Sequence, residues 1–414
     1  MVAAPLVVVG ASIAGLTTAE ALRAEGYAGP ITVVGDERHP PYLRPPLSKK
    51  ALADPEWSHA DAALYSADVL AAFDLDHVEG RATGLELPAR VVLVGERRIP
   101  FDRLVIATGV SPRRLAGTAG LAGVHALRTL DDVAGLRREL VAGARVTVIG
   151  SGVLGMELAA AGAKAGAAVT LIGRSAELRL GSAGTTLSPY LAELLRAGGV
   201  DLRLGVQVLE VRGAEASAAE RTAGGRVTAV VLADGTSIDT DVLVVAIGTT
   251  PNVEWLRGSG LDLDDGVLCD STGMAAPDVY AVGDVARWRD PLTGVAVRIE
   301  HQLSAIEQAH AVAKVLVTGQ PSAPVVPFFW SELFGSRILV HGEPGIGNGL
   351  TVVAGDPAGG RFVASASREG RVVGLVGWNM PREFRTERAA LLAEATARLP
   401  ALHDAASPTA RSSE

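Results

Sequence analysis

The sequence predicts an α/β protein with two parallel-sheet domains of the same plan, followed by a small α+β domain. The main observation is a pattern of apolar strand, glycine turn, helix and second strand that spans residues 7–36 and returns at residues 146–174. Each copy is followed later by an apolar strand that ends in Ala-x-Gly, at residues 107–109 and 246–248. After Pro321 the pattern changes to short strands and one final helix, which is typical of an α+β domain.

Length, charge and composition limit the classes of protein that this chain can represent. Its 414 residues are too many for one hydrophobic core and predict two or three domains. Its net charge of −8 argues against nucleic-acid binding, because neutralising phosphates needs a basic surface. Without a run of about 18 apolar residues or a secretory signal, we expect no membrane span and a cytoplasmic protein. The single cysteine, Cys269, cannot form an internal disulfide or a metal cluster site by itself, so we expect no bound metal.

The first repeat carries Gly10, Ser12 and Gly15 at the spacing of the G-x-G-x-x-G motif. Glycines in this motif let the backbone approach a pyrophosphate, whose charge then lies on the N–H groups of a helix N-terminus. Ser12 replaces the middle glycine by another small residue. Asp36 lies 21 residues after Gly15, at the end of the second strand, where an acid accepts hydrogen bonds from an adenosine ribose. The alternative is that Asp36 and Glu37 only open a solvated turn.

The second repeat carries the full motif, at Gly150, Gly152 and Gly155, and its helix also carries Glu157. One such motif is weak evidence alone. Two of them, each between a strand and a helix and each closed by a later strand, predict two Rossmann-like dinucleotide-binding domains.

The end of the second strand distinguishes the two repeats. The second repeat has no acid there, and Arg174 lies 19 residues after Gly155. An acid at this place would select a free 2′-hydroxyl, whereas an arginine would accept a 2′-phosphate. The residues therefore favour NADP(H) over NAD(H). The alternatives are that Arg174 is a solvated strand-end residue, or that Arg179 takes the role.

Three further segments carry candidate site residues. The proline-rich segment at residues 39–52 cannot be a helix interior, and its stiff turns would hold Arg44 and Lys49 in place, unless both are ordinary surface cations. The segment at residues 276–286 predicts a strand and a turn that delivers Asp284. A helix is expected from near Glu300 to Gly319, and His301 at its start is either a structural hydrogen-bonding group or a group close to chemistry.

The motifs, taken in chain order, resemble the FAD-dependent NAD(P)H:ferredoxin reductases of the putidaredoxin reductase and rubredoxin reductase type. The resemblance rests on GASIAG, PYLRPPLSK, the ATG strand, GSGVLGMELAA, DVYAVGD, EHxxxA and FFWS, and it covers nearly the whole chain. It implies a glutathione-reductase-like flavoprotein fold. Residues 1–114 and 246–320 would bind FAD, residues 115–245 would bind NAD(P), and residues 321–403 would form a C-terminal α+β interface domain. Residues 404–414 are expected to be a disordered tail.

The resemblance also implies roles for individual residues. Lys49 would pair with Glu157 beside the flavin and the nicotinamide, and these two residues are the expected catalytic pair. Asp36 would hold the FAD ribose, and Asp284 the ribityl chain. The other cofactor-binding residues that we expect are Gly10, Ser12, Ile13, Ala14, Gly15, Arg44, Ala82, Ala107, Thr108, Gly109, Arg128, Gly150, Gly152, Val153, Leu154, Gly155, Arg174, Gly248, Gly283, Glu300, His301, Gln302 and Trp330.

The implied function is electron transfer from NAD(P)H through FAD to a ferredoxin-type protein that serves a cytochrome monooxygenase or dioxygenase, by a monomer or homodimer. An acidic ferredoxin would need a local positive surface, for which the candidates are Arg287, Arg289, Arg298, Arg337 and Arg382. Gln302 replaces a usual tryptophan, and FFWSELF replaces the usual WFWSDQY. These departures leave open a flavoenzyme that acts on a small molecule or oxygen. A disulfide or peroxide reductase using a redox cysteine and a non-enzymatic FAD-bound redox sensor also remain alternatives.

Overall fold

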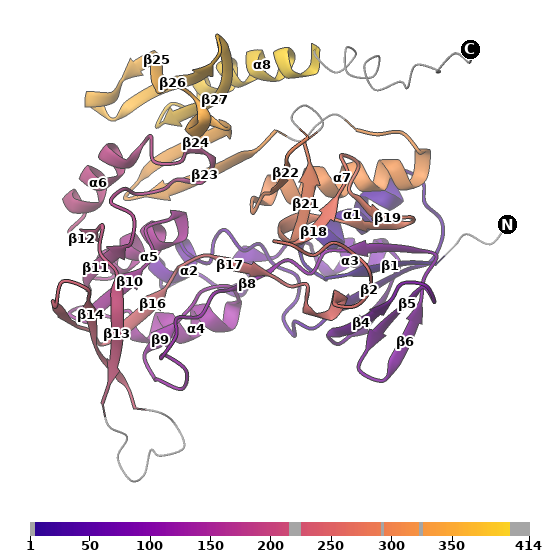
Figure 1. Cartoon of the computed structure of the whole chain (residues 1–414), viewed down its shortest axis with the longest axis horizontal. Helices are drawn as coiled ribbons and strands as arrows, with labels where there is room; N and C mark the ends of the chain where they lie inside the picture. Colours follow the sequence, from indigo (N-terminus) through magenta and orange to yellow (C-terminus); the bar gives the residue numbers. More distant parts are fainter. Residues whose placement is uncertain (1–4, 215–224, 291–293, 323–325, 398–414) are drawn as a thin grey trace, which may run out of the picture.

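A computed structural model describes residues 5–214, 225–290, 294–322 and 326–397, so the tail expected at residues 404–414 lies outside the described residues. Two parallel-sheet units lie side by side, and the C-terminal sheet lies against the second unit (Figure 1). The predicted α/β class with a smaller C-terminal domain is confirmed. Within the described residues, no helix is long and apolar enough to cross a membrane.

The first unit is built on a six-stranded sheet in the order β19-β20-β7-β1-β2-β3, in which only β19 is antiparallel to its neighbour. Leu6 and Val8 of β1 point to helices α1 and α7, whereas Val7 and Val9 point to the antiparallel sheet β4-β5-β6. Both faces of β1 are therefore buried, which explains its uninterrupted apolar sequence. The bounds are β1 Leu6–Val9, α1 Ile13–Ala24, β2 Ile31–Gly35, α2 Lys50–Ala53, η1 His59–Ala62, α3 Ala67–Ala72, β3 Leu75–Glu79, β4 Ala82–Glu86, β5 Val91–Val94, β6 Arg97–Pro100, β7 Arg103–Ile106, β19 Met274–Ala276, β20 Val279–Ala281 and α7 Gln302–Thr318.

The second unit repeats this plan with a five-stranded parallel sheet in the order β12-β11-β10-β16-β9. An antiparallel sheet, β13-β14-β15, again precedes the strand that pairs with the first strand of the repeat. The duplication therefore extends beyond the glycine motifs. The bounds are β9 Val124–His125, α4 Leu130–Glu139, β10 Arg145–Ile149, α5 Val153–Lys164, β11 Ala168–Gly173, η2 Gly181–Ala183, α6 Ser188–Ala197, β12 Asp201–Leu204, β13 Val208–Gly213, β14 Val227–Leu232, β15 Ser237–Asp239 and β16 Val242–Val245.

The connections between the units pair with each other, because β8 and β17 form a two-stranded antiparallel sheet. The chain then returns to the first sheet through β20, which pairs with β7. Cys269 ends β18 and is buried. The bounds are β8 Val110–Pro112, β17 Thr249–Pro251, η3 Glu254–Leu256, β18 Val267–Cys269, η4 Gly283–Val285, β21 Ala286–Arg289 and β22 Ala296–Arg298.

The C-terminal domain is an antiparallel sheet in the order β23-β24-β27-β26-β25 with helix α8 on one face. Its other face joins a core that also contains α4, α5 and α6 of the second unit, Leu47 and Ala51 of the proline-rich segment, and Trp57 just after that segment. One hydrophobic core therefore spans all three parts of the chain. The bounds are β23 Phe328–Leu333, β24 Ser336–Gly342, η5 Pro344–Ile346, β25 Leu350–Asp356, η6 Pro357–Gly359, β26 Arg361–Arg368, β27 Arg371–Trp378 and α8 Pro381–Ala397.

Candidate active site

The two glycine loops have the same backbone geometry. Gly10 and Gly150 both have a φ of +126°, a conformation that residues with a Cβ rarely adopt. A Cβ at Gly10 would lie 2.2 Å from the backbone oxygen of Ala107, and one at Gly150 would lie 2.0 Å from that of Ala246. Each glycine therefore allows its loop to cross the strand that ends in Ala-x-Gly.

The last glycine of each motif lets the helix begin close to its own loop. A Cβ at Gly15 would lie 1.9 Å from the oxygen of Gly10, and one at Gly155 would lie 1.8 Å from that of Gly150. The middle position differs, because a Cβ at Gly152 would meet nothing within 4 Å. This position faces open space, which explains how the first repeat accommodates Ser12.

Both helices begin without a side-chain cap. Ser12 and Gly152 are the N-caps of α1 and α5, and neither makes a side-chain capping hydrogen bond. Ile13 and Ala14, and likewise Val153 and Leu154, form the first helical positions. Exposed N–H groups at a helix N-terminus beside a close-approach loop fit the pyrophosphate of a dinucleotide. The residues of both loops therefore fit the cofactors that the sequence predicts.

The strand ends after the loops differ in charge. Asp36 follows β2 and pairs with Arg81, Oδ2 to Nε at 2.8 Å. Arg174 follows β11, is exposed, and has no hydrogen bond or ion pair within the described residues. Arg179 is also exposed, and its backbone N–H donates to the oxygen of Ser151 in the glycine loop at 3.0 Å. Ala82, expected beside the adenine, is a buried residue at the start of β4.

The residues after Ala107 connect the first unit to the two-stranded sheet formed by β8 and β17. Thr108 donates its hydroxyl to the backbone oxygen of Asn252 at 2.9 Å, and the Asn252 amide donates to the oxygen of Thr108 at 2.8 Å. Gly109 and Gly248 both have positive φ, and a Cβ at Gly248 would meet nothing within 4 Å. Asn252 therefore fixes the connection between the first unit and the sheet formed by β8 and β17. The sequence did not indicate this role for Asn252.

Arg128 and Asp284 come together from distant parts of the chain. Arg128 Nη2 lies 3.0 Å from Asp284 Oδ2, and the two side chains are only partly exposed. Gly283, just before Asp284, has a φ of +74° and donates its N–H to the side-chain oxygen of Gln308 at 2.8 Å. A Cβ at Gly283 would lie 2.8 Å from Ala14 Cβ, so this turn touches the start of α1.

Arg44 is held by partners from its own segment and from the second unit. Its guanidinium forms an ion pair with Glu37 and donates to Tyr42 at 3.0 Å and to the backbone oxygen of Arg128 at 2.7 Å. Burial is the main reason that the pKa of Tyr42 is raised to about 12. The Tyr42 hydroxyl therefore stays neutral and donates a hydrogen bond to Glu37. Arg44 is fixed by its partners and is not an ordinary surface cation.

Lys49 and Glu157 form an ion pair, with Lys49 Nζ 2.9 Å from Glu157 Oε1. The Glu157 side chain is only 4% exposed, and it accepts two further hydrogen bonds. Ser48 donates to Oε2, and Ser331 donates to Oε1 at 2.8 Å. The carboxylate, which α5 carries, is therefore bound by the proline-rich segment and by the C-terminal domain.

The start of α7 lies beside the C-terminal domain. His301 is the N-cap of α7, and its ring centre lies 4.7 Å from that of Phe329. Burial lowers the pKa of His301 to about 4, so the imidazole is neutral at pH 7. Glu300 is engaged with Thr249 and Arg298, and Gln302 is the first residue of α7. Trp330 lies in β23, where its ring approaches that of Phe328 at 6.5 Å.

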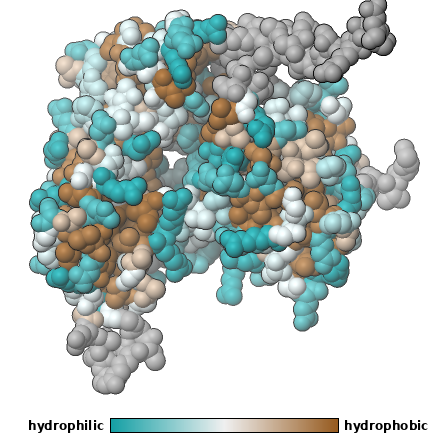
Figure 2. Space-filling view, in the orientation of Figure 1, coloured by the Kyte–Doolittle hydropathy of each residue, from teal (hydrophilic) through white to brown (hydrophobic). Residues whose placement is uncertain are grey.

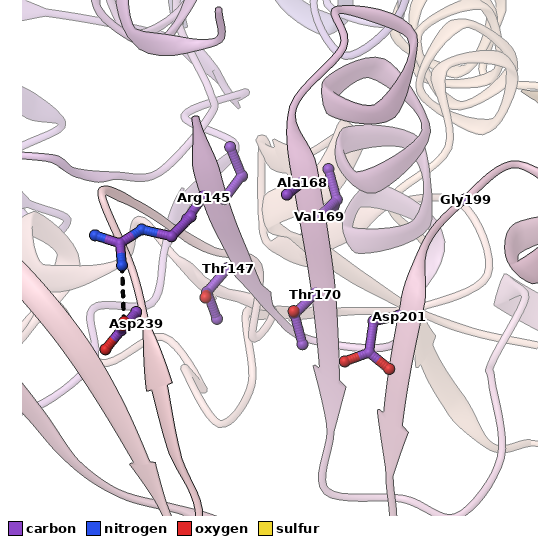
Figure 3. A pocket seen from close by; sticks show the side chains of 9 residues that line it. Arg145, Thr147, Ala168, Val169, Thr170, Gly199, Asp201 and Asp239 are labelled. Atoms are coloured by element: carbon purple, nitrogen blue, oxygen red, sulfur yellow. Dashed lines mark hydrogen bonds and ion pairs between the residues drawn. The ribbon is translucent and has the colours of Figure 1, made fainter. Parts of the chain in front are cut away.

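A pocket of about 230 Å³ lies elsewhere on the second unit (Figure 3). It is lined by Arg145, Ala168 and Asp201, which are the first residues of β10, β11 and β12. The glycine loop follows the other end of these parallel strands. In doubly wound sheets ligands bind at the carboxyl ends of the strands, so this pocket is not the dinucleotide site. In the space-filling view, the face shown is hollowed near its centre, between the two units (Figure 2).

The fold and the paired loops define an oxidoreductase with two dinucleotide-binding units of common plan. Comparison with known proteins gives the family. Residues 4–311 match the pyridine nucleotide-disulphide oxidoreductase family, and residues 328–412 match the reductase C-terminal family. The chain belongs to the pyridine nucleotide-disulphide oxidoreductase family, in its FAD-dependent ferredoxin reductase branch.

Individual relatives agree over almost the whole chain. Putidaredoxin reductase CamA of Pseudomonas putida is 34% identical over 92% of this chain and 90% of its own. The anthranilate 1,2-dioxygenase system ferredoxin–NAD(+) reductase component of Burkholderia cepacia is 36% identical over 95% and 96%. The crystal structure of a covalent putidaredoxin reductase–putidaredoxin complex matches with a TM-score of 0.87 and 32% identity, over 94% of this chain and 93% of that chain.

Proposed function

We propose that this protein transfers electrons from NAD(P)H, bound by the second unit, through FAD, bound by the first unit, to a ferredoxin-type iron–sulfur protein in the cytoplasm. The nicotinamide gives up one hydride, which carries two electrons, and two one-electron acceptors receive them. When bound, FAD supplies the conversion between two-electron and one-electron chemistry. The names of the relatives and the ordered motifs support this proposal.

The observation that carries the proposal is the Lys49–Glu157 pair, in which the carboxylate is buried and the ammonium group is partly exposed. Lys49 belongs to the first unit and Glu157 to the helix that begins at the second glycine loop, so the pair joins the two nucleotide-binding units. A buried ion pair needs further hydrogen bonds to offset desolvation, and the two serines supply them. In our proposal the pair holds an ordered positive charge where the units meet.

The disulfide reductase alternative is disfavoured by the chemistry of Cys269. Burial is the main cause that raises the pKa of this thiol to about 12, so the thiolate needed for disulfide exchange is absent at neutral pH. The thiol donates to the backbone oxygen of Val267 at 3.4 Å within β18. Cys269 is a structural residue of the first unit.

The dinucleotide preference is a finer proposal, and we propose NADPH. Arg174 supports it, because this exposed guanidinium follows the strand end where a 2′-phosphate would lie. The Burkholderia cepacia relative is named for NAD(+), so the preference of this chain needs its own test. Calorimetry with 2′,5′-ADP and 5′-AMP would compare wild type with Arg174→Ala and, as the competing candidate, Arg179→Ala. We expect Arg174→Ala to weaken 2′,5′-ADP at least 10-fold and 5′-AMP less than 2-fold. Equal losses for both ligands would contradict the preference.

Fewer arginines are available for a positive surface toward an acidic acceptor than the sequence suggests. Arg298 is only 10% exposed and pairs with Asp265 and Glu300, and Arg287 pairs with Asp264. These two arginines neutralise neighbouring acids. Arg289, Arg337 and Arg382 are exposed and remain candidates.

The test is anaerobic transfer from the NADPH-reduced protein to a ferredoxin, measured by ferredoxin bleaching at several salt concentrations. We expect transfer that slows as salt rises, because opposite charges steer the encounter. Reoxidation by oxygen or a small molecule at a rate that ferredoxin never increases would favour the second candidate, a flavoenzyme acting directly on such a substrate. Gln302 at the start of α7 is the departure that motivates this candidate.

A further inference from the structure

We propose that Ser331 is a positioning residue for hydride transfer, through which the C-terminal domain fixes the Glu157 carboxylate and, with it, Lys49. Ser48 is its counterpart on the other carboxylate oxygen. This inference rests on the proposed function only in that NAD(P)H reduces the bound flavin. It does not depend on the identity of the acceptor.

Ser331 is an exception on the strand that carries it. The inward residues of β23 are Phe329, Ser331 and Leu333, which are 7%, 0% and 0% exposed. A serine hydroxyl buried without a hydrogen-bond partner destabilises the folded state. The hydroxyl of Ser331 avoids this cost through its 2.8 Å hydrogen bond to Glu157, across the interface between β23 and α5. Its place on an apolar face is therefore explained by the carboxylate.

Glu157 is a fully engaged carboxylate. Oε1 accepts from Lys49 and Ser331, and Oε2 accepts from Ser48. Ser48 and Lys49 are consecutive residues, so one short segment contacts both oxygens. Donors of this kind favour the ionised form and leave the carboxylate little rotational freedom. Removing Ser331 leaves Oε1 with Lys49 as its one remaining donor among the described residues.

Lys49 transmits the effect. Its ammonium group has three hydrogens to donate. It forms the ion pair with Glu157 Oε1 and donates a hydrogen bond to the backbone oxygen of Pro45 at 3.2 Å. The side chain is 19% exposed, so the group is not sealed from a ligand. A carboxylate that turns or becomes protonated would release Lys49 from this orientation.

The experiment compares Ser331→Ala with Ser331→Thr, which keeps the hydroxyl, and with the matched control Ser365→Ala. Ser365 lies in β26 of the same sheet, is half-buried, and makes no side-chain hydrogen bond within the described chain. Anaerobic stopped-flow reduction by NADPH gives a limiting rate and an apparent Kd. We expect Ser331→Ala to lower the limiting rate 5- to 20-fold with Kd changed less than 2-fold, Ser331→Thr to recover most of the rate, and Ser365→Ala to match wild type.

A second readout needs no turnover. Infrared spectroscopy of the carboxylate bands that disappear in Glu157→Gln reports the hydrogen bonding of Glu157 directly, with or without bound cofactor. We expect these bands to shift in Ser331→Ala and in Ser48→Ala relative to wild type, because each variant removes a hydrogen-bond donor to the carboxylate. The Ser48→Ala arm keeps the inference testable if Ser331→Ala does not fold.

Two results would overturn the inference. One is the absence of any shift of the Glu157 carboxylate bands in both serine variants. The other is a Ser331→Ala loss that is equally large in a Lys49→Met background, since residues acting as one unit are not additive. Failure of the proposed acceptor would be seen separately, as a wild-type protein that NADPH reduces normally and ferredoxin does not reoxidise.

Discussion

Gly150 and Gly152 belong to one loop, but each needs to be small for a different reason. Gly150 has a φ of +126°, and a Cβ there would lie 2.0 Å from the backbone oxygen of Ala246. Gly152 has a negative φ and open space around it. Protein packing demands the first glycine, whereas the second borders the space in which we place the dinucleotide.

We therefore expect Gly150→Ala to destabilise the protein by about 3 kcal/mol, from backbone strain and the clash together. Gly152→Ser should change stability by less than about 0.5 kcal/mol, because serine is a good N-cap and Ser12 already occupies the matching place. Urea unfolding of both variants, together with binding of NADP⁺, checks this. Weakened binding with unchanged stability in Gly152→Ser would place the dinucleotide at this position. Equal stability losses in the two variants would contradict the distinction.

At the same residue scale, the sequence could predict Lys49 and Glu157 but not the serines that bind them. The family resemblance implies the ion pair, because it places each residue in a recognisable segment. Ser48 and Ser331 bring three segments together across long sequence separations, and a serine in an apolar strand has no pattern of its own. The sequence signal that could have found Ser331 is its place between inward-facing Phe329 and Leu333.

Among the elements, the β23–β24 hairpin shows how packing compensates an unfavourable turn residue. Phe334 and Gly335 connect the two strands, and Phe334 has a φ of +47°, which favours glycine or asparagine. Its ring covers Gly198 at the end of α6, where a Cβ would lie 2.2 Å from the ring. Phe334 thus fixes the C-terminal sheet on the second unit, although its positive φ is unfavourable for a phenylalanine in this turn.

This contact reverses the usual effect of replacing a glycine. Gly198 has a φ of −79°, so alanine would normally stabilise the protein by about 0.5 kcal/mol. Here we expect Gly198→Ala to destabilise it by about 1 kcal/mol, because the new methyl group meets the Phe334 ring. In a Phe334→Asn background the same change should be stabilising. Urea unfolding of the four proteins measures this coupling, and an identical effect in both backgrounds would show that the ring does not matter.

Element boundaries were predictable where a residue has one structural meaning. The expected end of α7 at Gly319 is confirmed, because Gly319 has a φ of +71° at the C-cap. The start of the last helix is less predictable, since α8 begins at Pro381. Proline interrupts a helix interior but is favoured in its first turn, and the sequence alone does not distinguish these cases.

At the scale of the whole molecule, one hydrophobic core is shared by parts of the chain that the sequence assigns to separate domains. Apolar side chains from the proline-rich segment, the second unit and the C-terminal sheet form one cluster. Sequence patterns locate strands and helices, but they do not show which apolar faces meet. The domain bounds stay a prediction. We expect the second unit and the C-terminal domain to unfold together.

His301 and His341 contribute to the pH dependence of the stability of the whole molecule. Burial lowers the pKa of His301 and of His341 to about 4, and Arg388 contributes to the shift of His341. Neither ring nitrogen of His341 has a hydrogen-bond partner within the described residues. Between pH 6.5 and 4 the unfolded chain binds protons that the folded chain does not, so stability falls as the pH is lowered through this window. Each histidine contributes a slope of about 1 kcal/mol per pH unit.

His341→Phe should remove one of these two contributions. His341 is fully buried, and its ring lies 6.1 Å from that of Phe328, so an apolar ring suits the site. We expect the slope of unfolding free energy against pH to decrease by about 1 kcal/mol per pH unit between pH 6 and 4.5. The variant should also be about 1 kcal/mol more stable at pH 7, because an unpaired buried polar group is lost. The control is His310→Phe on α7, whose exposed side chain should leave the slope unchanged. Urea unfolding across this pH range decides the matter, and parallel curves for His341→Phe and wild type would mean that His341 takes up its proton equally in both states.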